Sequence, residues 1–342
     1  MFDKKFLNQI ITSLGNDKPT RNSRVLVVDS MNTFIRSFST INLMNPAGHH
    51  IGGLVGYLRS VGYAIKTFRP TRVILVFDGL GSTNNKKNLY PAYKGNRNIT
   101  RITNWDMFDN KVDESQAMVD QMTRLIQYLQ QLPVTLVSID KIEADDSIGL
   151  IADHFEKDKL CNEITIMSAD KDFYQLISDK TSVYSPTKKK TYKTADILEE
   201  FNVHPNNFLI YKTLLGDSSD NLPGIKGMGP KKIVKLFPLA DVEEYNLKDI
   251  YSMSEDNIDT NHMYKSILEA KHQLDINYQL MNLREPNISE ENTTEIYRLL
   301  NEEITHLNLG GFMVLYESDG LQNAIGNTHS WLSDVFGALI LK

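Results

Sequence analysis

The sequence predicts an α/β fold in which a mostly parallel central sheet carries helices on both faces, followed by a helical C-terminal domain. Short apolar runs typical of buried strands alternate with segments whose apolar residues recur at helical spacing. Such alternation is the pattern of βαβ units, which build parallel sheets. The strand-like runs span 24–29, 72–78, 134–139, 163–168 and 182–185, and the helical patterns span 51–68, 114–131 and 145–157.

Two further stretches complete the predicted organisation. From about residue 206 the pattern becomes helical and stays so to about residue 309, so we expect an α/β domain over 1–200 and a helical domain over 201–342. An insertion at about 79–112 interrupts the α/β alternation, is rich in Asn, Lys, Gly and Tyr, and lacks a clear apolar face. Insertions of this kind in compact domains are commonly functional lids or mobile segments.

The composition is that of a chain with a substantial core, with 41% hydrophobic and 23% charged residues over 342 positions. The single Cys161 excludes a disulfide framework and a thiolate zinc site. The first 22 residues lack the apolar core of a signal peptide, and no apolar run is long enough to span a membrane. We expect a cytoplasmic protein (in the host cytoplasm if it is phage-encoded) that makes no membrane contact.

Acidic residues follow several of the predicted strands and turns. In open α/β sheets, functional sites lie beyond the carboxyl ends of the strands, so these carboxylates should converge. Converging carboxylates repel one another and stay ionised only if cations neutralise them, and oxygen ligands in such number suit Mg²⁺ or Mn²⁺. The predicted metal ligands are Asp29, Asp78, Glu143, Asp145, Asp146, Asp170, Asp172, Asp217 and Asp220.

Each of these acids has a simpler explanation by itself. A single Asp after a strand, such as Asp29, is commonly a helix N-cap or a turn residue. Independent capping does not predict the recurrence of Asp-x-Asp at 170–172, Glu-x-Asp-Asp at 143–146 and Asp-x-x-Asp at 217–220. The joint pattern favours a two-metal site for phosphodiester chemistry.

The basic residues are grouped, although the net charge is −6. Between Asn84 and Asn104 the chain carries five basic residues and no acidic one, and Tyr90 to Arg97 combines aromatics that suit base stacking with cations that suit phosphates. A disordered, solvated loop is the alternative for this segment. Basic surfaces around an acidic metal centre favour a nucleic-acid substrate.

A glycine-rich segment follows at 221–235. Gly224, Gly227 and Gly229 permit positive φ or close backbone approach, and Pro230 suits the first turn of a helix. Free N–H groups at that helix start would form a site for a nucleic-acid phosphate. Lys226, Lys231 and Lys232 lie beside it. A helix-loop-helix connector with a solvated basic face is the alternative.

Together these motifs resemble the flap endonuclease (5′-nuclease) family, and most closely its phage 5′→3′ exonuclease branch, also called phage ribonuclease H. The resemblance covers about 24–240 and finds no clear counterpart after about residue 245. The matching residues, in order, are Asp29, Asp78-Gly79, Tyr93-Lys94-Gly95-Asn96-Arg97, Glu143–Asp146, Ala169–Asp172, Gly216–Asn221 and Gly224–Gly229.

The resemblance implies a PIN-like 5′-nuclease core that holds two Mg²⁺, with Mn²⁺ as a substitute. It implies that the insertion is a helical arch for a single-stranded 5′ end, that Lys94 contacts the scissile phosphate and that Arg97 assists it. Tyr93, Lys94 and Arg97 would bind nucleic acid there. The segment at about 206–237 would be a helix-three-turn-helix that grips the duplex and binds K⁺ through backbone carbonyls.

The tail at 330–341 has its apolar residues on one helical face. Packing against its own helical domain is the favoured explanation, and docking to a sliding clamp or a single-strand-binding protein is the alternative. The residues on this face are Trp331, Leu332, Val335, Phe336, Leu339 and Ile340.

The sequence thus predicts a monomeric, metal-dependent 5′→3′ exonuclease and flap endonuclease. By resemblance its substrates are RNA–DNA hybrids and duplex DNA with a 5′ flap or fork, as in primer removal during phage DNA replication. The alternatives are a PIN-type ribonuclease and a structure-specific DNA-binding protein without catalysis. Neither fits as well, because the first needs no arch or duplex grip and the second would have lost carboxylates.

Overall fold

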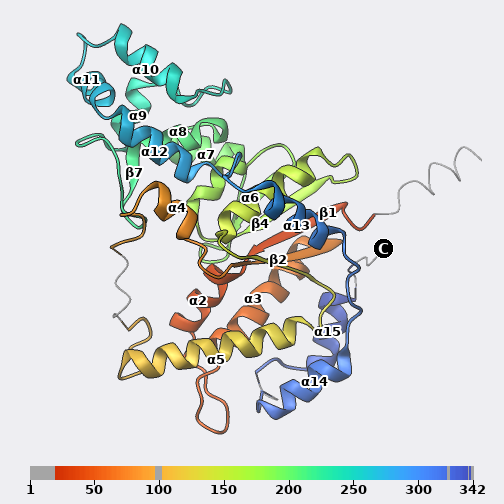
Figure 1. The fold of residues 1–342 in the computed structure, drawn as a ribbon. Coiled ribbons are helices and arrows are strands. Elements are labelled where there is room, and N and C mark those ends of the chain that lie inside the picture. The colour runs from red at the N-terminus through yellow and green to blue at the C-terminus, as the bar shows by residue number, and fades with distance from the viewer. Residues whose placement is uncertain (1–19, 97–101, 322–323, 338, 340–342) are drawn as a thin grey trace, which may run out of the picture.

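The protein is built around a six-stranded sheet with strand order β3-β2-β1-β4-β5-β6 (Figure 1). The computed structural model describes residues 20–96, 102–321, 324–337 and 339. Five strands are parallel, and β6 adds an antiparallel edge to β5. The predicted fold class and the five predicted strands are confirmed, whereas β6 was not foreseen. The strands are β1 (Arg24–Asp29), β2 (Arg72–Asp78), β3 (Thr135–Ile139), β4 (Glu163–Met167), β5 (Thr181–Ser185) and β6 (Lys190–Tyr192).

Side chains of the strands alternate between two hydrophobic cores, one on each face of the sheet. In β1, Val25 and Val27 belong to one core, and Leu26 and Val28 belong to the other. Period-two alternation with apolar residues at every position is what a strand buried on both faces requires. The continuous apolar runs in the sequence therefore indicated strands that are buried on both faces of the sheet.

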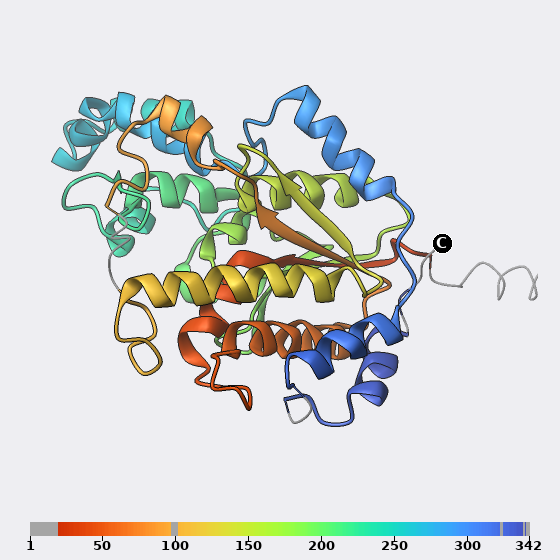
Figure 2. The ribbon, with the colours of Figure 1, turned by 60° about the horizontal axis from the view of Figure 1, so that its bottom comes forward.

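Helices from distant parts of the chain cover these faces. In Figure 2 the red-orange α2 and α3 and the yellow α5 lie on one side of the strands, and the blue α13 lies on the other with α6. The predicted helices at 51–68, 114–131 and 145–157 are confirmed. The helices are α2 (Ser30–Thr40), α3 (Gly52–Phe68), α5 (Lys111–Leu129), α6 (Ala144–Lys157) and α13 (Glu290–Asn301).

The helix α2 was missed by the sequence prediction. It begins directly after β1, and Asp29 is both the last residue of that strand and the N-cap of α2, accepting a hydrogen bond from the Asn32 backbone N–H. The strand therefore passes into the helix without a loop, which leaves no turn signal to mark the boundary.

Short helices follow the sheet and gather beside its carboxyl edge, at the upper left of Figure 1. In this part α8 and α9 flank a two-stranded turn (Gly216–Asp217 and Leu222–Pro223) and the glycine-rich segment, and α12 packs on α8. The helical elements are η1 (Lys171–Leu176), α7 (Thr194–Phe201), η2 (Pro205–Asn207), α8 (Phe208–Leu215), α9 (Pro230–Leu236), α10 (Leu247–Asp256), α11 (His262–Glu269) and α12 (Lys271–Met281).

The C-terminal helices α14 (Leu309–Ser318) and α15 (Thr328–Phe336) return to the α/β core, so the expectation that the tail packs on the helical domain is wrong. Figure 1 places them beside α3 and α5, far from α10 to α12. Leu332, Val335 and Phe336 are buried in the core that covers this face of the sheet. The apolar face of the tail therefore has an intramolecular partner. Its packing covers a broad apolar stripe on α3 that would otherwise be exposed to solvent.

In the described part of the insertion, one short helix, α4 (Asn84–Leu89), is followed by turns up to Asn96. Residues 97–101 lie outside the described part of the chain, and Arg97 is among them. Within the described residues, no helix has the length and hydropathy needed to cross a membrane.

Candidate metal centre and nucleic-acid interface

The two central strands end at carboxylates that share one electrostatic environment. Asp29 at the end of β1 accepts a hydrogen bond of 2.8 Å from Ser168 Oγ, and Asp78 at the end of β2 accepts one of 2.9 Å from the Ala144 backbone N–H. Burial, with a smaller contribution from the charges of Asp78 and Asp145, raises the pKa of Asp29 to about 7, although hydrogen bonds from Ser168 and Asn32 oppose the rise. Asp29 is thus a helix cap and a member of the acidic centre at once.

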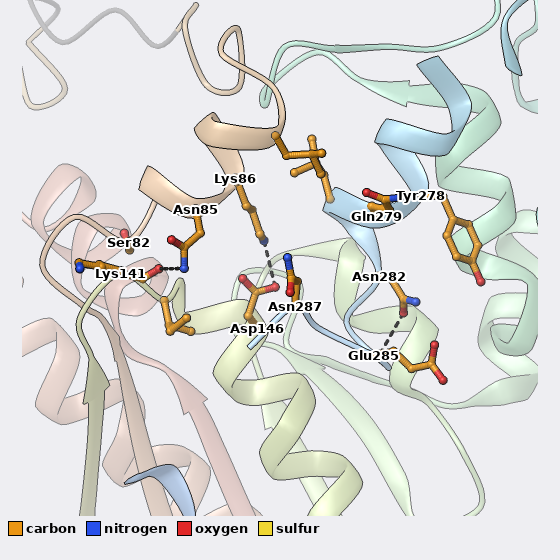
Figure 3. A pocket seen from close by; sticks show the side chains of 13 residues that line it. Ser82, Asn85, Lys86, Lys141, Asp146, Tyr278, Gln279, Asn282, Glu285 and Asn287 are labelled. Atoms are coloured by element: carbon orange, nitrogen blue, oxygen red, sulfur yellow. Dashed lines mark hydrogen bonds and ion pairs between the residues drawn. The ribbon is translucent and has the colours of Figure 1, made fainter. Parts of the chain in front are cut away.

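The start of α6 supplies a group of carboxylates suited to hold a cation. One carboxylate oxygen each from Glu143, Asp145 and Asp146 lies within 4.8 Å of the others. The Lys86 ammonium of α4 lies 3.0 Å from Glu143 Oε2 and 3.0 Å from Asp146 Oδ1, as Figure 3 shows for Asp146. Burial raises the pKa of Asp146 to about 7, although Lys86 opposes that rise. The Lys86 ammonium therefore supplies positive charge next to the negative carboxylates at the start of α6.

A second group forms where η1 meets α8. Lys212 Nζ lies 2.7 Å from Asp172 Oδ1 and 2.7 Å from Asp217 Oδ2. Burial, followed by the charge of Asp170, raises the pKa of Asp172 to about 7. Asp217 behaves in the opposite way, because hydrogen bonds from Lys212 and Ser219 outweigh its burial and lower its pKa to about 2.

Sequence reasoning missed Lys86 and Lys212 as members of the centre. Lys212 did carry a signal, since it is the one charged residue in the apolar helix Phe208–Leu215 and lies five positions before Asp217. A lone cation in an apolar helix needs a buried counter-charge. Lys86 carried no comparable signal, because it lies in a stretch of several lysines and asparagines.

The base of the insertion is fixed to the acidic centre and to the loop that carries Asp220. Lys94 adopts a positive φ of 55°, its backbone N–H donates to the Asp220 carbonyl at 2.9 Å, and its ammonium pairs with Glu143 Oε1. Asn96 Nδ2 donates to the Ser218 carbonyl at 2.6 Å, and Asn221 Nδ2 donates to the Ala92 carbonyl at 2.8 Å. These contacts hold Lys94 at the edge of the carboxylates.

Tyr93 is not placed to stack on bases, so that expectation is wrong for this arrangement of the chain. Its side chain is 1% exposed. Its hydroxyl donates to Glu143 Oε2 at 2.8 Å and lies 3.2 Å from Asp220 Oδ2. The ring is drawn inward because its hydroxyl is a donor that two carboxylates can share.

The predicted duplex grip comprises α8, α9 and the glycine-rich segment between them. The three lysines predicted to contact the duplex, Lys226, Lys231 and Lys232, are exposed. Gly227 has a φ of 78°, and a Cβ on Gly224 would meet the Leu215 carbonyl oxygen at 2.0 Å. These two glycines are required by the backbone, whereas nothing lies within 4 Å of a Cβ built on Gly229.

Two buried amides connect this grip to the carboxylates through α12. Asn277 Nδ2 donates to the Pro223 carbonyl at 2.9 Å, while Gln175 Nε2 donates to the Asp172 and Met281 carbonyls at 3.0 Å each. Asn277 is fully buried, and Gln175 is 1% exposed. The glycine-rich segment and the Asp172 segment therefore both contact the C-terminal half of α12, at positions four residues apart.

Comparison with known proteins is consistent with this geometry. Residues 24–202 match the family model described as the 5′-3′ exonuclease N-terminal resolvase-like domain, and residues 203–299 match the 5′-3′ exonuclease C-terminal SAM fold. The chain belongs to the 5′-3′ exonuclease family. This membership confirms the predicted 5′-nuclease family and its exonuclease activity, and it extends the match beyond residue 245, where no counterpart was expected.

Relatives of this 5′-3′ exonuclease family member include whole exonucleases and parts of polymerases. The chain is 32% identical over 237 residues to a 5′-3′ exonuclease of Bacillus subtilis, covering 67% of this chain and 72% of the relative. It is 29% identical to DNA polymerase I of the same organism, covering 69% of this chain and 25% of the polymerase. The match therefore spans about a quarter of the polymerase.

Solved structures resemble it in fold. The flap endonuclease of bacteriophage T5, solved as a complex with DNA and metal ions, has a TM-score of 0.60 and 19% identity, covering 86% of this chain and 99% of that one. The T5 5′-exonuclease with bound zinc ions has a TM-score of 0.60 and 20% identity, covering 88% and 100%. At these identities the likeness establishes the shared architecture.

Proposed function

We propose that this 5′-3′ exonuclease hydrolyses phosphodiesters with two Mg²⁺ ions, which Mn²⁺ can replace, and that it also removes 5′ flaps. The observation that carries the proposal is the gathering of carboxylates from five separate segments at one edge of the sheet, with Lys94 fixed beside them. Such a centre suits in-line displacement at a phosphate.

The residues present fit divalent cations. Burial raises the pKa of Asp29, Asp146 and Asp172 to about 7, so a bound cation would favour their ionised forms. Oxygen ligands are those that Mg²⁺ and Mn²⁺ prefer. We assign Asp29, Asp78, Glu143, Asp145 and Asp146 to the first ion, and Asp170, Asp172, Asp217 and Asp220 to the second.

In this proposal the side chains of the chain position the substrate strand. Bound ions would supply an activated water and would offset charge on the leaving oxygen. The Lys94 ammonium, held beside Glu143 by its own backbone hydrogen bond to Asp220, would move to a non-bridging oxygen of the scissile phosphate and stabilise the charge that develops there. Arg97 would assist Lys94, and cleavage would leave a 5′-phosphate.

The glycine-rich segment would hold the duplex by its backbone. Lys226, Lys231 and Lys232 are exposed and adjoin Gly227 and Gly229, an arrangement that suits contacts with phosphates rather than bases. We include in the proposal a K⁺ ion on backbone carbonyls of this segment. The Gly227 carbonyl accepts a hydrogen bond of 2.8 Å from Lys232 Nζ, which would have to be released if that carbonyl bound the ion.

We further propose that the substrates are RNA–DNA hybrids and DNA with a 5′ flap or fork. In this proposal the protein removes primers in phage DNA replication, and it acts as a cytoplasmic monomer. A sliding clamp or single-strand-binding protein would bind the C-terminal region outside the buried face of α15. The expected separation into domains at residues 200 and 201 is kept as part of this proposal.

End-labelled flaps and RNA–DNA hybrids test the activity directly. We expect Mg²⁺-dependent cleavage that is lost in EDTA and in the double variant Asp29→Asn with Asp172→Asn. Asp140→Asn, at an exposed turn residue, is the matched control. Cleavage by the double variant at the wild-type rate would refute the assigned centre.

A further inference from the structure

A cavity of about 310 Å³ lies between the insertion and α12, next to the acidic centre (Figure 3). Helix α4 forms one wall, the end of α12 and the segment that follows it form the other, and the start of α6 forms the floor. Lys86 of α4 pairs with the carboxylates of Glu143 and Asp146 at this floor. Its size is at the lower end of the range for small-molecule sites, which suits a single nucleotide.

The cavity shares two residues with the acidic centre. Asp146 and Lys86 line it, and they are also 3.0 Å apart in the ion pair of that centre. A strand whose phosphate lies at the carboxylates would therefore have an adjoining nucleoside at the mouth of the cavity.

The lining has the chemistry of a nucleobase site. Four amide side chains, Asn85, Gln279, Asn282 and Asn287, offer donors and acceptors, as Figure 3 shows. Asn282 Oδ1 accepts from the backbone N–H groups of Arg284 and Glu285, so its NH₂ group is the part that can donate to a ligand.

Apolar surface completes the lining. Leu89 and Leu280 supply apolar contacts, whereas the Tyr278 ring points away from the cavity (Figure 3). A base has flat apolar faces and an edge of donors and acceptors, so this combination matches it better than it matches a phosphate. Amides can offer either a donor or an acceptor, so we expect little preference among the bases.

We propose that this cavity binds the base of the unpaired nucleotide on the 5′ side of the bond that is cut. The inference rests on the proposed function, because it needs a strand whose phosphate lies at the carboxylates. The nucleotide is placed on the 5′ side because α4 belongs to the insertion, which is expected to receive the single-stranded 5′ end. The duplex is assigned instead to the glycine-rich segment that follows α8. The cavity would draw the leaving nucleotide away from the template.

A cycle of enzyme and substrate variants tests the proposal. The double variant Gln279→Ala with Asn287→Ala changes two exposed side chains, so it should fold. Wild type should cleave a flap that is abasic at this nucleotide with a kcat/KM about tenfold below that for the intact flap, as expected for the loss of one or two hydrogen bonds. The double variant should cleave both flaps with the reduced kcat/KM that wild type shows on the abasic flap.

His272→Ala, an exposed position on the same helix, is the control and should behave as wild type. Equal cleavage of the two flaps by wild type would overturn the proposal, as would a deficit of the double variant that adds in full to the abasic deficit. Absence of cleavage of either flap by wild type would instead count against the proposed function.

A second readout does not depend on cleavage. A flap with 2-aminopurine at this nucleotide, bound in Ca²⁺, should change fluorescence with wild type and His272→Ala and not with the double variant at matched saturation. The same fluorescence change with all three proteins would place the base elsewhere and overturn the proposal.

Discussion

The Tyr93 hydroxyl donates a hydrogen bond of 2.8 Å to Glu143 Oε2, which joins the base of the insertion to the start of α6. Because the same hydroxyl lies 3.2 Å from Asp220 Oδ2, one side chain connects three segments that are distant in sequence. The position of the insertion over the carboxylates is therefore coupled to the acidic centre itself.

Tyr93→Phe should lower stability while it keeps the buried ring. We expect a loss of about 1.5–3 kcal/mol, the usual net value of one hydrogen bond to a charged partner. Urea unfolding of the metal-free protein measures it, with Tyr90→Phe as control. Equal midpoints for the two variants would mean that the Tyr93 hydroxyl contributes nothing.

The metal-free protein should lose stability as the pH rises from about 4 to about 7. Burial raises the pKa of Asp29, Asp146 and Asp172 from 3.8 to about 7, so between these values the folded state binds more protons than the unfolded state. By linkage, the free energy of unfolding then falls with rising pH. Asp217, with a pKa of about 2, acts below this window.

Thermal unfolding in EDTA at several pH values between 5 and 8 checks this dependence. The melting temperature should fall across the range in EDTA and fall less in saturating Mg²⁺, because cations and protons compete for the same oxygens. A melting temperature that rises from pH 5 to pH 7 in EDTA would contradict the raised pKa values.

Lys212→Met should make stability depend on divalent metal. The variant keeps an apolar stem but leaves Asp172 and Asp217 without the ammonium 2.7 Å away, and loss of one partner of a buried ion pair costs about 3–5 kcal/mol. Added Mg²⁺ or Mn²⁺ should restore more of the melting temperature in this variant than in wild type. Lys235→Met, at an exposed position, is the control. Identical metal responses in Lys212→Met and Lys235→Met would show that Lys212 does not balance the charge of these carboxylates.

Lys94→Ala should slow turnover far more than it weakens binding. Its ammonium adjoins Glu143, and loss of one group that stabilises transition-state charge typically lowers kcat by about 10²–10³. Single-turnover kinetics and fluorescence anisotropy in Ca²⁺ separate the two effects. Comparable losses in rate and in affinity would mean that Lys94 only tethers the substrate.

Charge reversal at Lys231 and Lys232 should weaken binding to all sequences alike. Both side chains are exposed next to the glycine-rich segment. Each lost phosphate contact should reduce the slope of log K against log salt by about 1. Lys248→Glu, on α10, is the control, and a slope that stays at the wild-type value would rule out phosphate contacts at Lys231 and Lys232.

The sequence by itself determined the sheet, its covering helices and the family. Continuous apolar runs that end in Asp29 and Asp78 mark buried parallel strands, because local patterning follows burial directly. The need for glycine at 224 and 227 was also predictable from the sequence, because the backbone requirement at each position is set by residues nearby in the chain. These features depend on short stretches of chain.

Only the tertiary structure decided which charges pair and which faces meet. Lys86 joins Asp146 across 60 positions, Tyr93 turns inward to Glu143, and α15 packs on α3 rather than on α10 to α12 (Figure 1). A side chain's partner is set by how whole elements pack, so a lysine in a polar stretch gives no sign of a buried carboxylate far along the chain. Packing, and not local pattern, places the cations within the acidic centre.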